Sequence, residues 1–204
     1  LEQLRMKAYD ALIFTSHALP LADILPYAKT GRVVVCHDPG QVKINAAFTD
    51  RGETYEEGCQ WLKAHGAQKI GMFLPRSRKL SATSQAMLGA YAKVFGENLP
   101  ANLQVLDVMN NEDGYQAAEQ LAVQQVDAIF TNGDDIAAGA VQYYRELGLA
   151  LPLFVGQENQ LSSQLLNMPT IDHHFRVVGE LALRLAVGEL SGQHQVASTF
   201  IART

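Results

Sequence analysis

The sequence predicts an α/β protein with parallel β-sheets. Short apolar runs, typical of buried strands, alternate along most of the 204 residues with amphipathic stretches long enough for helices. Strands that alternate with helices pair in parallel through right-handed crossovers. Several apolar runs end in a polar cluster, as at residues 132–135 and 157–159. In a parallel sheet the carboxyl ends of the strands share one edge, so these clusters are candidates for a ligand site.

In the first half of the chain, apolar runs mark the strands, and apolar residues at three- and four-residue spacing mark the helices. Val33, Val34 and Val35 form a strongly β-branched run, which favours a strand. Pro20 and Pro26 predict a short or broken helix. The expected strands are 11–14, 33–35, 44–49 and 69–74, and the expected helices are 1–10, 19–29, 53–65 and 85–95.

The stretch from residue 126 to residue 149 shows this pattern clearly, because an apolar run ending at Phe130 precedes a helical repeat. Asp134 or Asp135 is the expected N-cap of that helix, since a carboxylate accepts from the free N–H groups of the first turn. Gly148 is the expected stop. The other expected strands are 103–109, 126–130, 151–155 and 200–201, with an extended passage at 169–172, and the other expected helices are 114–122, 134–147, 162–166 and 177–190.

Composition and charge argue against several classes of protein. With 48% apolar and 18% charged residues, the chain has the composition of a globular protein. No run approaches the ~20 apolar residues of a membrane span, so we expect no membrane contact. A net charge of −5 offers no basic surface to a nucleic-acid backbone. Cys36 and Cys59 form no CxxC motif and no export signal is visible, so we expect a cytoplasmic protein.

Motifs for catalysis are missing from the sequence. There is no GxSxG, P-loop or GxGxxG pattern. Ser81 and Thr83 have no adjacent histidine to act as a base. His173 and His174 are neighbours on an extended segment and face opposite ways, which disfavours a shared metal ion. We therefore expect no enzyme activity, no metal and no cofactor.

A series of short motifs stands in a fixed order along the chain. Residues 9–13 read YDALI, 66–71 read GAQKIG, 134–140 read DDIAAGA, 145–148 read RELG and 170–172 read TID. Together they resemble VDGII, GHRRIA, NDxxAxGAxxxLRELG and TTVDQ, the motifs of the effector-binding core of the LacI/GalR family of bacterial transcriptional regulators. Arg203 and Thr204 stand where that family ends in RxST. The resemblance covers essentially the whole chain.

This resemblance implies the type I periplasmic-binding-protein fold: two Rossmann-like parallel-sheet subdomains, a ligand cleft between them and three crossover strands. The N-terminal subdomain would comprise residues 1–49 and 173–196, and the C-terminal subdomain residues 50–172 and 197–204. The crossovers would fall near residues 48–50, 172–174 and 196–198. The family's helix-turn-helix headpiece, hinge helix and first β-α-β unit have no counterpart in the sequence, so we expect it to be part of a longer protein.

The resemblance also implies an effector site. The expected effector-binding residues are Thr15, Asp38, Met109, Asn132, Glu158 and His173. Cys36 is the alternative to Asp38, because the match is ambiguous by two residues. Glu158 occupies the family's acidic, hydroxyl-binding position, His173 that of a glutamine at the hinge, and Met109 that of a side chain packed on the ligand.

Two positions depart from the family's pattern. Ala86 replaces the arginine that grips the ligand, and Gly133 replaces an asparagine, with Asn132 displaced by one residue. Each lost hydrogen bond is worth about 0.5–1.5 kcal/mol. Either Arg76, Arg78 or Asn132 substitutes, or the effector differs from the family's common hexoses.

The implied function is the effector-sensing core of a LacI-type regulator, which responds to a sugar or related metabolite. Such a core is a homodimer and reaches operator DNA only through the headpiece. The expected dimer-interface residues are Ala138, Gln142, Leu161 and Leu165. The main alternative is a periplasmic or lipoprotein sugar-binding protein of a transport system, which shares the fold. The two unpaired cysteines and the pattern at Arg203 favour the regulator.

Overall fold

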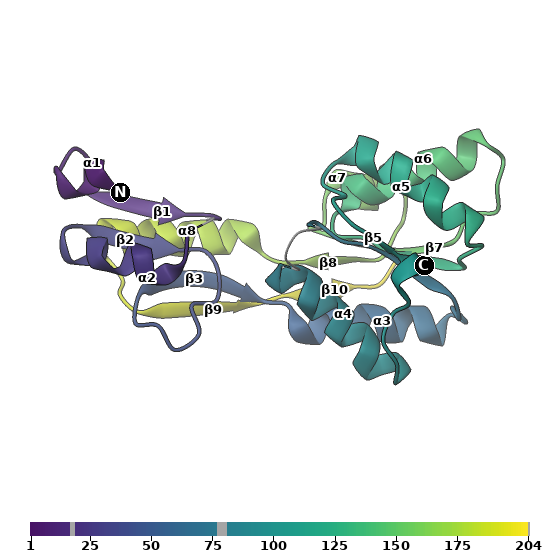
Figure 1. Ribbon diagram of the computed structural model, residues 1–204, viewed down its shortest axis with the longest axis horizontal. Coiled ribbons are helices and arrows are strands. Elements are labelled where there is room, and N and C mark those ends of the chain that lie inside the picture. The colour runs from purple at the N-terminus through teal and green to yellow at the C-terminus, as the bar shows by residue number, and fades with distance from the viewer. Residues whose placement is uncertain (17–18, 77–80, 204) are drawn as a thin grey trace. The chain divides into compact units, whose positions relative to one another are not determined.

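A computed structural model of the chain describes residues 1–16, 19–76 and 81–203. The chain divides into two compact units. Unit 1 comprises Leu1–Asp50 and His174–Ala197, and unit 2 comprises Arg51–His173 and Ser198–Thr204. Both units are α/β structures with mainly parallel sheets, which confirms the predicted fold class (Figure 1).

Unit 1 is built on a four-stranded sheet in the order β1-β2-β3-β9, and all neighbouring strands are parallel. The strands are β1 (Ala11–Phe14), β2 (Arg32–Val35), β3 (Asn45–Asp50) and β9 (Gln193–Ala197), and the helices are α1 (Glu2–Arg5), α2 (Leu21–Ile24), the 3-10 helix η1 (Leu25–Lys29) and α8 (Phe175–Val187). The predicted break at Pro26 is confirmed, because α2 ends just before η1 begins.

The β-branched run of β2 explains how unit 1 is layered. Side chains alternate across a strand, so Val33 and Val35 pack on one face while Val34 packs on the other. The first face is covered by α1 and α2, which contribute Leu4 and Ile24. The second face is covered by α8, whose apolar residues form a separate cluster with Val34 (Figure 1).

Unit 2 is built on a six-stranded sheet in the order β10-β8-β7-β6-β4-β5. All pairs are parallel except β10 with β8. The strands are β4 (Ile70–Phe73), β5 (Gln104–Val105), β6 (Ala128–Phe130), β7 (Leu153–Gln157), β8 (Thr170–Asp172) and β10 (Thr199–Ile201), and the helices are α3 (Gly52–Ala64), α4 (Ala82–Phe95), the 3-10 helix η2 (Ala101–Leu103), α5 (Asn111–Val123), α6 (Asp134–Glu146) and α7 (Leu161–Leu165).

The strand order of unit 2 reverses at β4. The chain leaves β4 through α4 to reach β5 on one side, and it returns through α5 to place β6 on the other side. Helices α3 and α4 cover one face of the sheet, and α5 and α6 cover the opposite face (Figure 1). The loops after β4 and β6 therefore diverge at a topological switch point, where open α/β sheets bind their ligands.

Helices α5 and α6 cross at very short range because both carry glycine at the contact. A Cβ added at Gly139 would lie 2.0 Å from the carbonyl oxygen of Asn111, and one added at Gly114 would lie 2.1 Å from that of Ile136. Both obstacles are backbone atoms of the facing helix. Only glycine permits this separation between the two backbones.

Four local expectations differ from the structure. The helix expected over 1–10 is limited to α1, because Lys7 adopts a left-handed conformation with φ 57°. The strand expected over 103–109 is limited to β5, because Asp107 adopts a left-handed conformation with φ 63° and turns the chain. The N-cap of α6 is Gly133, not Asp134 or Asp135, which are the first two helical residues. Strand β9 was not expected, because its sequence, QHQVA, is mostly polar and it lies at the edge of its sheet.

Within the described ranges, no helix is both long and apolar enough to cross a membrane. Nor do the described histidine, cysteine, aspartate and glutamate side chains form a group of three that could hold a metal ion. Cys36 and Cys59 are free thiols. Burial raises the pKa of the Cys59 thiol to about 12, so this side chain behaves as a small apolar core residue.

Candidate functional site

The carboxyl edge of the unit 2 sheet gathers polar residues from neighbouring strands. Thr131 and Asn132 follow β6, Gln157 ends β7 and precedes Glu158, and His173 follows β8. Strands β6, β7 and β8 are parallel neighbours, so these residues lie along one edge. The edge adjoins the switch point between β4 and β6, where a ligand is expected.

Gln157 forms a buried hydrogen-bond network that the sequence did not reveal. Its Oε1 accepts from the Tyr55 hydroxyl at 3.1 Å and from His173 Nε2 at 3.0 Å, and its Nε2 donates to the carbonyl oxygen of Thr131 at 2.8 Å. An amide oxygen only accepts, so His173 carries a proton on Nε2. In the neutral ring, Nδ1 then accepts from the Ser198 hydroxyl at 2.9 Å.

This network changes what His173 is expected to do. The residue is 1% exposed, and both ring nitrogens are bonded inside unit 2. His173 can contact a ligand only if it gives up one of these hydrogen bonds. In the present arrangement it bonds to Gln157 and thereby stabilises the end of β7, directly before Glu158. Direct effector contact by His173 stays a prediction. The only sequence signal for Gln157 is its place after an apolar run and beside Glu158.

Asp134 joins its helix to two other segments. The residue is fully buried, and its two carboxylate oxygens accept from the Thr170 hydroxyl at 2.6 Å and from the Gln160 backbone N–H at 2.7 Å. Gly156 leaves the space for it, because a Cβ there would lie 2.1 Å from Asp134 Oδ1. Burial raises the pKa of the Asp134 carboxyl, and these hydrogen bonds oppose that rise. Asp134 therefore fixes the loop after β7.

Glu158 opens that loop with an unusual backbone conformation. Its φ is 93°, and φ of Asn159 is 50°, so two successive non-glycine residues are left-handed. The residue is exposed, and its Oε2 accepts from Gln160 Nε2 at 2.6 Å. Partial desolvation and the charge of Asp134 raise the pKa of the Glu158 carboxyl, while the charge of Arg51 lowers it. A carboxyl group is thus presented at the edge of the sheet in a fixed turn.

Arg51 supplies a cation near this edge that the sequence analysis missed. It is the N-cap residue of α3, and its Nη1 donates to Thr83 Oγ1 of α4 at 3.1 Å. Burial raises the pKa of Tyr55, and the charge of Arg51 opposes that shift as it does for Glu158. Arg51 thus brings a guanidinium to α4, the helix on which Ala86 replaces the family's arginine. No motif marks Arg51 in the sequence.

Asn132 carries an unused hydrogen-bonding atom. Its Nδ2 donates to the carbonyl oxygen of Val108 at 3.0 Å, whereas its Oδ1 is buried and has no hydrogen-bond partner among the described residues. A buried acceptor without a donor costs stability, which makes it a feature that calls for an explanation. Met109, next to Val108, is 54% exposed, and its backbone N–H donates to the Asp113 carboxylate at 2.8 Å.

The predicted residues of unit 1 also lie at carboxyl ends of strands. Thr15 follows β1 and Asp38 lies beyond the end of β2, and both are exposed. Asp38 Oδ1 accepts from the Gly40 backbone N–H at 2.8 Å, which closes a local turn. Cys36, the alternative, is half-buried. Of the two predicted substitute cations, Arg76 is exposed, and Arg78 lies outside the described residues.

The residues predicted for a dimer interface lie on α6 and α7. Leu161 and Leu165 are 66% and 77% exposed, which is unusual for leucine. Gln142 is exposed, with its Nε2 donating to Glu146 Oε1 at 2.7 Å, and Ala138 is half-buried. Helices α6 and α7 contact each other, so these residues lie on neighbouring helices of unit 2.

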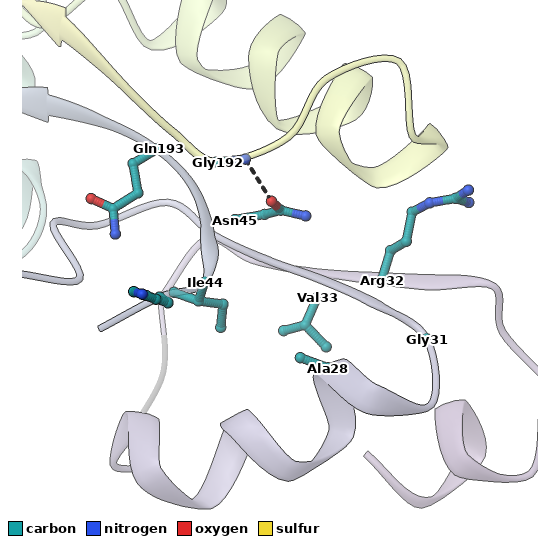
Figure 2. Close-up of a pocket in the computed structure, with 9 residues that line it drawn as sticks. Ala28, Gly31, Arg32, Val33, Ile44, Asn45, Gly192 and Gln193 are labelled. Carbon is teal, nitrogen blue, oxygen red and sulfur yellow. Dashed lines mark hydrogen bonds between the residues drawn. The ribbon is translucent and has the colours of Figure 1, made fainter. Parts of the chain in front are cut away.

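A cavity of about 550 Å³ lies within unit 1 at the amino ends of β2 and β3, away from the carboxyl edge (Figure 2). Its wall includes Asn45, whose Oδ1 accepts from the Gly192 backbone N–H at 2.8 Å. Arg32 also lines it, but its guanidinium lies against Gly188, at the end of α8. None of the predicted effector-binding residues lines this cavity.

Two α/β units with mainly parallel sheets are the architecture of the periplasmic-binding-protein fold. The family described as periplasmic binding proteins and sugar binding domain of LacI family matches residues 1–179. The chain belongs to this family, which confirms the resemblance drawn from the short motifs.

Curated relatives are regulators. Catabolite control protein B of Bacillus subtilis (strain 168) is 30% identical over 187 residues, which cover 91% of this chain and 60% of that protein. The uncharacterized HTH-type transcriptional regulator YkvZ of the same organism is 24% identical over 201 residues, covering 95% of this chain and 61% of that protein. The chain thus spans about three fifths of the length of these relatives, whose names describe a control protein and a transcriptional regulator.

Solved structures share the fold at low sequence identity. A LacI family transcriptional regulator from Lactobacillus casei with bound sucrose has a TM-score of 0.85 and 17% identity, covering 100% of this chain and 81% of that one. The transcriptional regulator CelR in complex with cellobiose has a TM-score of 0.79 and 17% identity, and the match covers 99% of this chain and 67% of that one. At this identity the likeness establishes the fold alone.

Proposed function

We propose that this chain is the effector-sensing core of a bacterial LacI-type transcriptional regulator and that its effector is a sugar or related metabolite. Membership of the family and the similarity to regulators from Bacillus subtilis support the regulatory role. The solved structures with bound sucrose and cellobiose support a sugar as the class of effector.

The observation that carries this proposal is the set of acceptors and a cation along the carboxyl edge of unit 2. Asn132 has a buried carbonyl oxygen without a donor among the described residues, Glu158 has a carboxylate held in a fixed turn, and Arg51 has a guanidinium close to both α3 and α4. Sugar hydroxyls both donate and accept, so they match this mixture. Arg51 is our candidate for the gripping cation that Ala86 does not supply.

His173, Gln157 and Asp134 would position the ligand contacts. They are buried, and their hydrogen bonds fix the ends of β7 and β8 and the loop that carries Glu158. Preorganised side chains bind more tightly because less freedom is lost on binding. Effector binding at this edge would then bias the conformation of the regulator, and operator DNA would be bound by a part of the regulator outside this chain.

The first test is a thermal-shift screen of the purified protein with sugars, sugar phosphates and purines. We expect at least one sugar to raise the melting temperature saturably, because a ligand that binds only the native state stabilises it. Asn132→Ala should weaken its binding about two- to tenfold, because it removes a neutral hydrogen bond to the ligand. Glu158→Ala should weaken it about tenfold or more, because that hydrogen bond involves a charged group.

The matched control for this test is Gln116→Ala. Gln116 is exposed on α5, and Glu112, at 3.2 Å, is the only partner of its side chain in the described part of the chain, so the sugar-dependent shift should persist in this variant. The proposal fails if no compound shifts the melting temperature, or if the Asn132 and Glu158 variants respond as the wild type does.

A second expected result concerns self-association through α6 and α7. Replacing both Leu161 and Leu165 with glutamate should weaken the homodimer about a hundredfold, because two large apolar side chains are lost and two carboxylates would have to be buried. Sedimentation velocity across a concentration series measures this. Val123→Glu, at a side chain that is 77% exposed on α5, is the control and should leave the association unchanged. Equal association of all three proteins would place the interface elsewhere.

A further inference from the structure

A cavity of about 360 Å³ lies in unit 2, in addition to the one in unit 1, at the end of the sheet opposite Glu158. It lies where the chain enters β7, at Leu151 and Phe154, and where it approaches β8, at Met168. The end of α3 closes one side with Trp61 and His65. The five residues of β7 separate this cavity from the carboxyl edge, so the two sites are distinct.

The walls of the cavity are apolar and include aromatic rings. Phe154 and Met168 are 6% and 5% exposed and form the inner surface, and Leu151 is 50% exposed at the rim. Trp61 and His65 stack with their ring centroids 3.8 Å apart and an interplanar angle of 26°. His65 Nδ1 lies 2.8 Å from the Trp61 carbonyl oxygen, so this nitrogen carries the proton and the stack is fixed. Walls of this kind favour a flat apolar group.

One cation at the cavity is uncommitted. Arg145 of α6 lines it and is exposed, and its guanidinium makes no ion pair or hydrogen bond with the other described residues. Arg203, which also lines it, is already engaged: its two terminal nitrogens donate to the Met168 carbonyl oxygen at 2.8 Å and to Asn159 Oδ1 at 2.7 Å. A guanidinium pairs best with a carboxylate. The Arg145 guanidinium therefore favours a ligand that carries an anionic group beside its apolar part.

We propose that this cavity binds a small aromatic carboxylate. The ring packs against Phe154, Met168 and the Trp61 side of α3, and the carboxylate pairs with Arg145. The volume falls within the range of about 300–1,000 Å³ that is usual for small-molecule sites. The proposal does not rest on the sugar-sensing role, because it uses none of the residues assigned to that site.

Benzoate is the probe, and the fluorescence of Trp61 is the readout, since this is the only tryptophan in the chain. Titration with benzoate should change the tryptophan emission saturably. Benzamide, which has the same ring and no charge, should bind about tenfold more weakly, which corresponds to about 1.4 kcal/mol. Arg145→Gln should reduce the affinity for benzoate about tenfold and leave that for benzamide unchanged.

Three further variants make the test specific. Leu151→Glu should abolish benzoate binding, because it puts a carboxylate into the lining of the cavity, where it repels the carboxylate of the ligand and competes with it for Arg145. Arg184→Gln, which removes an exposed arginine of unit 1 that does not line the cavity, should bind benzoate as the wild type does. Asn132→Ala should do the same, which separates this site from the sugar site. The proposal is overturned if benzoate gives no saturable change, or if benzamide or the Arg145 variant matches the wild type with benzoate.

Discussion

Replacing Gly139 with alanine lowers the free energy of unfolding by about 3 kcal/mol or more, the upper range for inserting atoms into a packed interior. The new Cβ would stand 2.0 Å from the Asn111 carbonyl oxygen and 2.9 Å from its carbonyl carbon. Neither atom can move without moving α5, so the two helices must separate along their contact. Urea denaturation followed by circular dichroism measures the loss.

Gly89→Ala is the matched control, because the exchange is the same and the surroundings are open. Gly89 lies in the interior of α4, is exposed, and a Cβ there would meet nothing within 4 Å. Alanine is the better helix former by about 0.8–1 kcal/mol, so this variant should be more stable than the wild type. If both variants lose stability alike, the close approach of α5 and α6 is not what restricts Gly139.

Most of the fold could be predicted from the sequence because the signals are local. The strand 11–14 coincides with β1, and the helix expected at 134–147 differs from α6 only at its end. Hydrophobic periodicity decides such elements within a single stretch of chain. Strand β9 gave no such signal: its residues alternate between exposed and half-buried, and it is held by β3, which lies far away in the sequence.

The candidate site could be predicted only in part, for the same physical reason. Glu158 and Asn132 follow apolar runs, so their place at the ends of strands was visible. Arg51 and Gln157 owe their roles to partners more than thirty and one hundred residues away, Thr83 for the first and Tyr55 for the second. Tertiary contacts of this kind leave no mark on local composition.

Asp134 shows how such contacts also override a local rule. An aspartate at the start of a helical repeat is expected to cap the helix, at a gain of about 1 kcal/mol. Here Gly133 takes the cap position, and the Asp134 carboxylate instead accepts from Thr170 and Gln160. A role in joining three segments predicts a larger effect of mutation than a role as a cap.

Asp134→Ala should therefore lower the free energy of unfolding by about 3 kcal/mol at neutral pH, because it leaves the buried donors of Thr170 and Gln160 without an acceptor. Asp135→Ala is the control one residue along the same helix. Asp135 is exposed, and among the described residues its carboxylate accepts only from the Ser162 hydroxyl at 2.7 Å, so the loss of this side chain should cost about 1 kcal/mol or less. Equal losses in urea denaturation would mean that Asp134 acts only as a residue of the first turn.

The dependence of this effect on pH follows from the direction of the pKa shift. Burial raises the pKa of the Asp134 carboxyl in the folded protein above its unfolded value, and the hydrogen bonds only partly offset the rise. A carboxyl with a raised folded pKa contributes stability that is fully present below the unfolded pKa and is lost as pH rises through the folded pKa. The stability difference between the wild type and Asp134→Ala should therefore be greatest at acid pH and should shrink as the pH rises. A difference that grows with pH would mean that the hydrogen bonds to the carboxylate outweigh its desolvation.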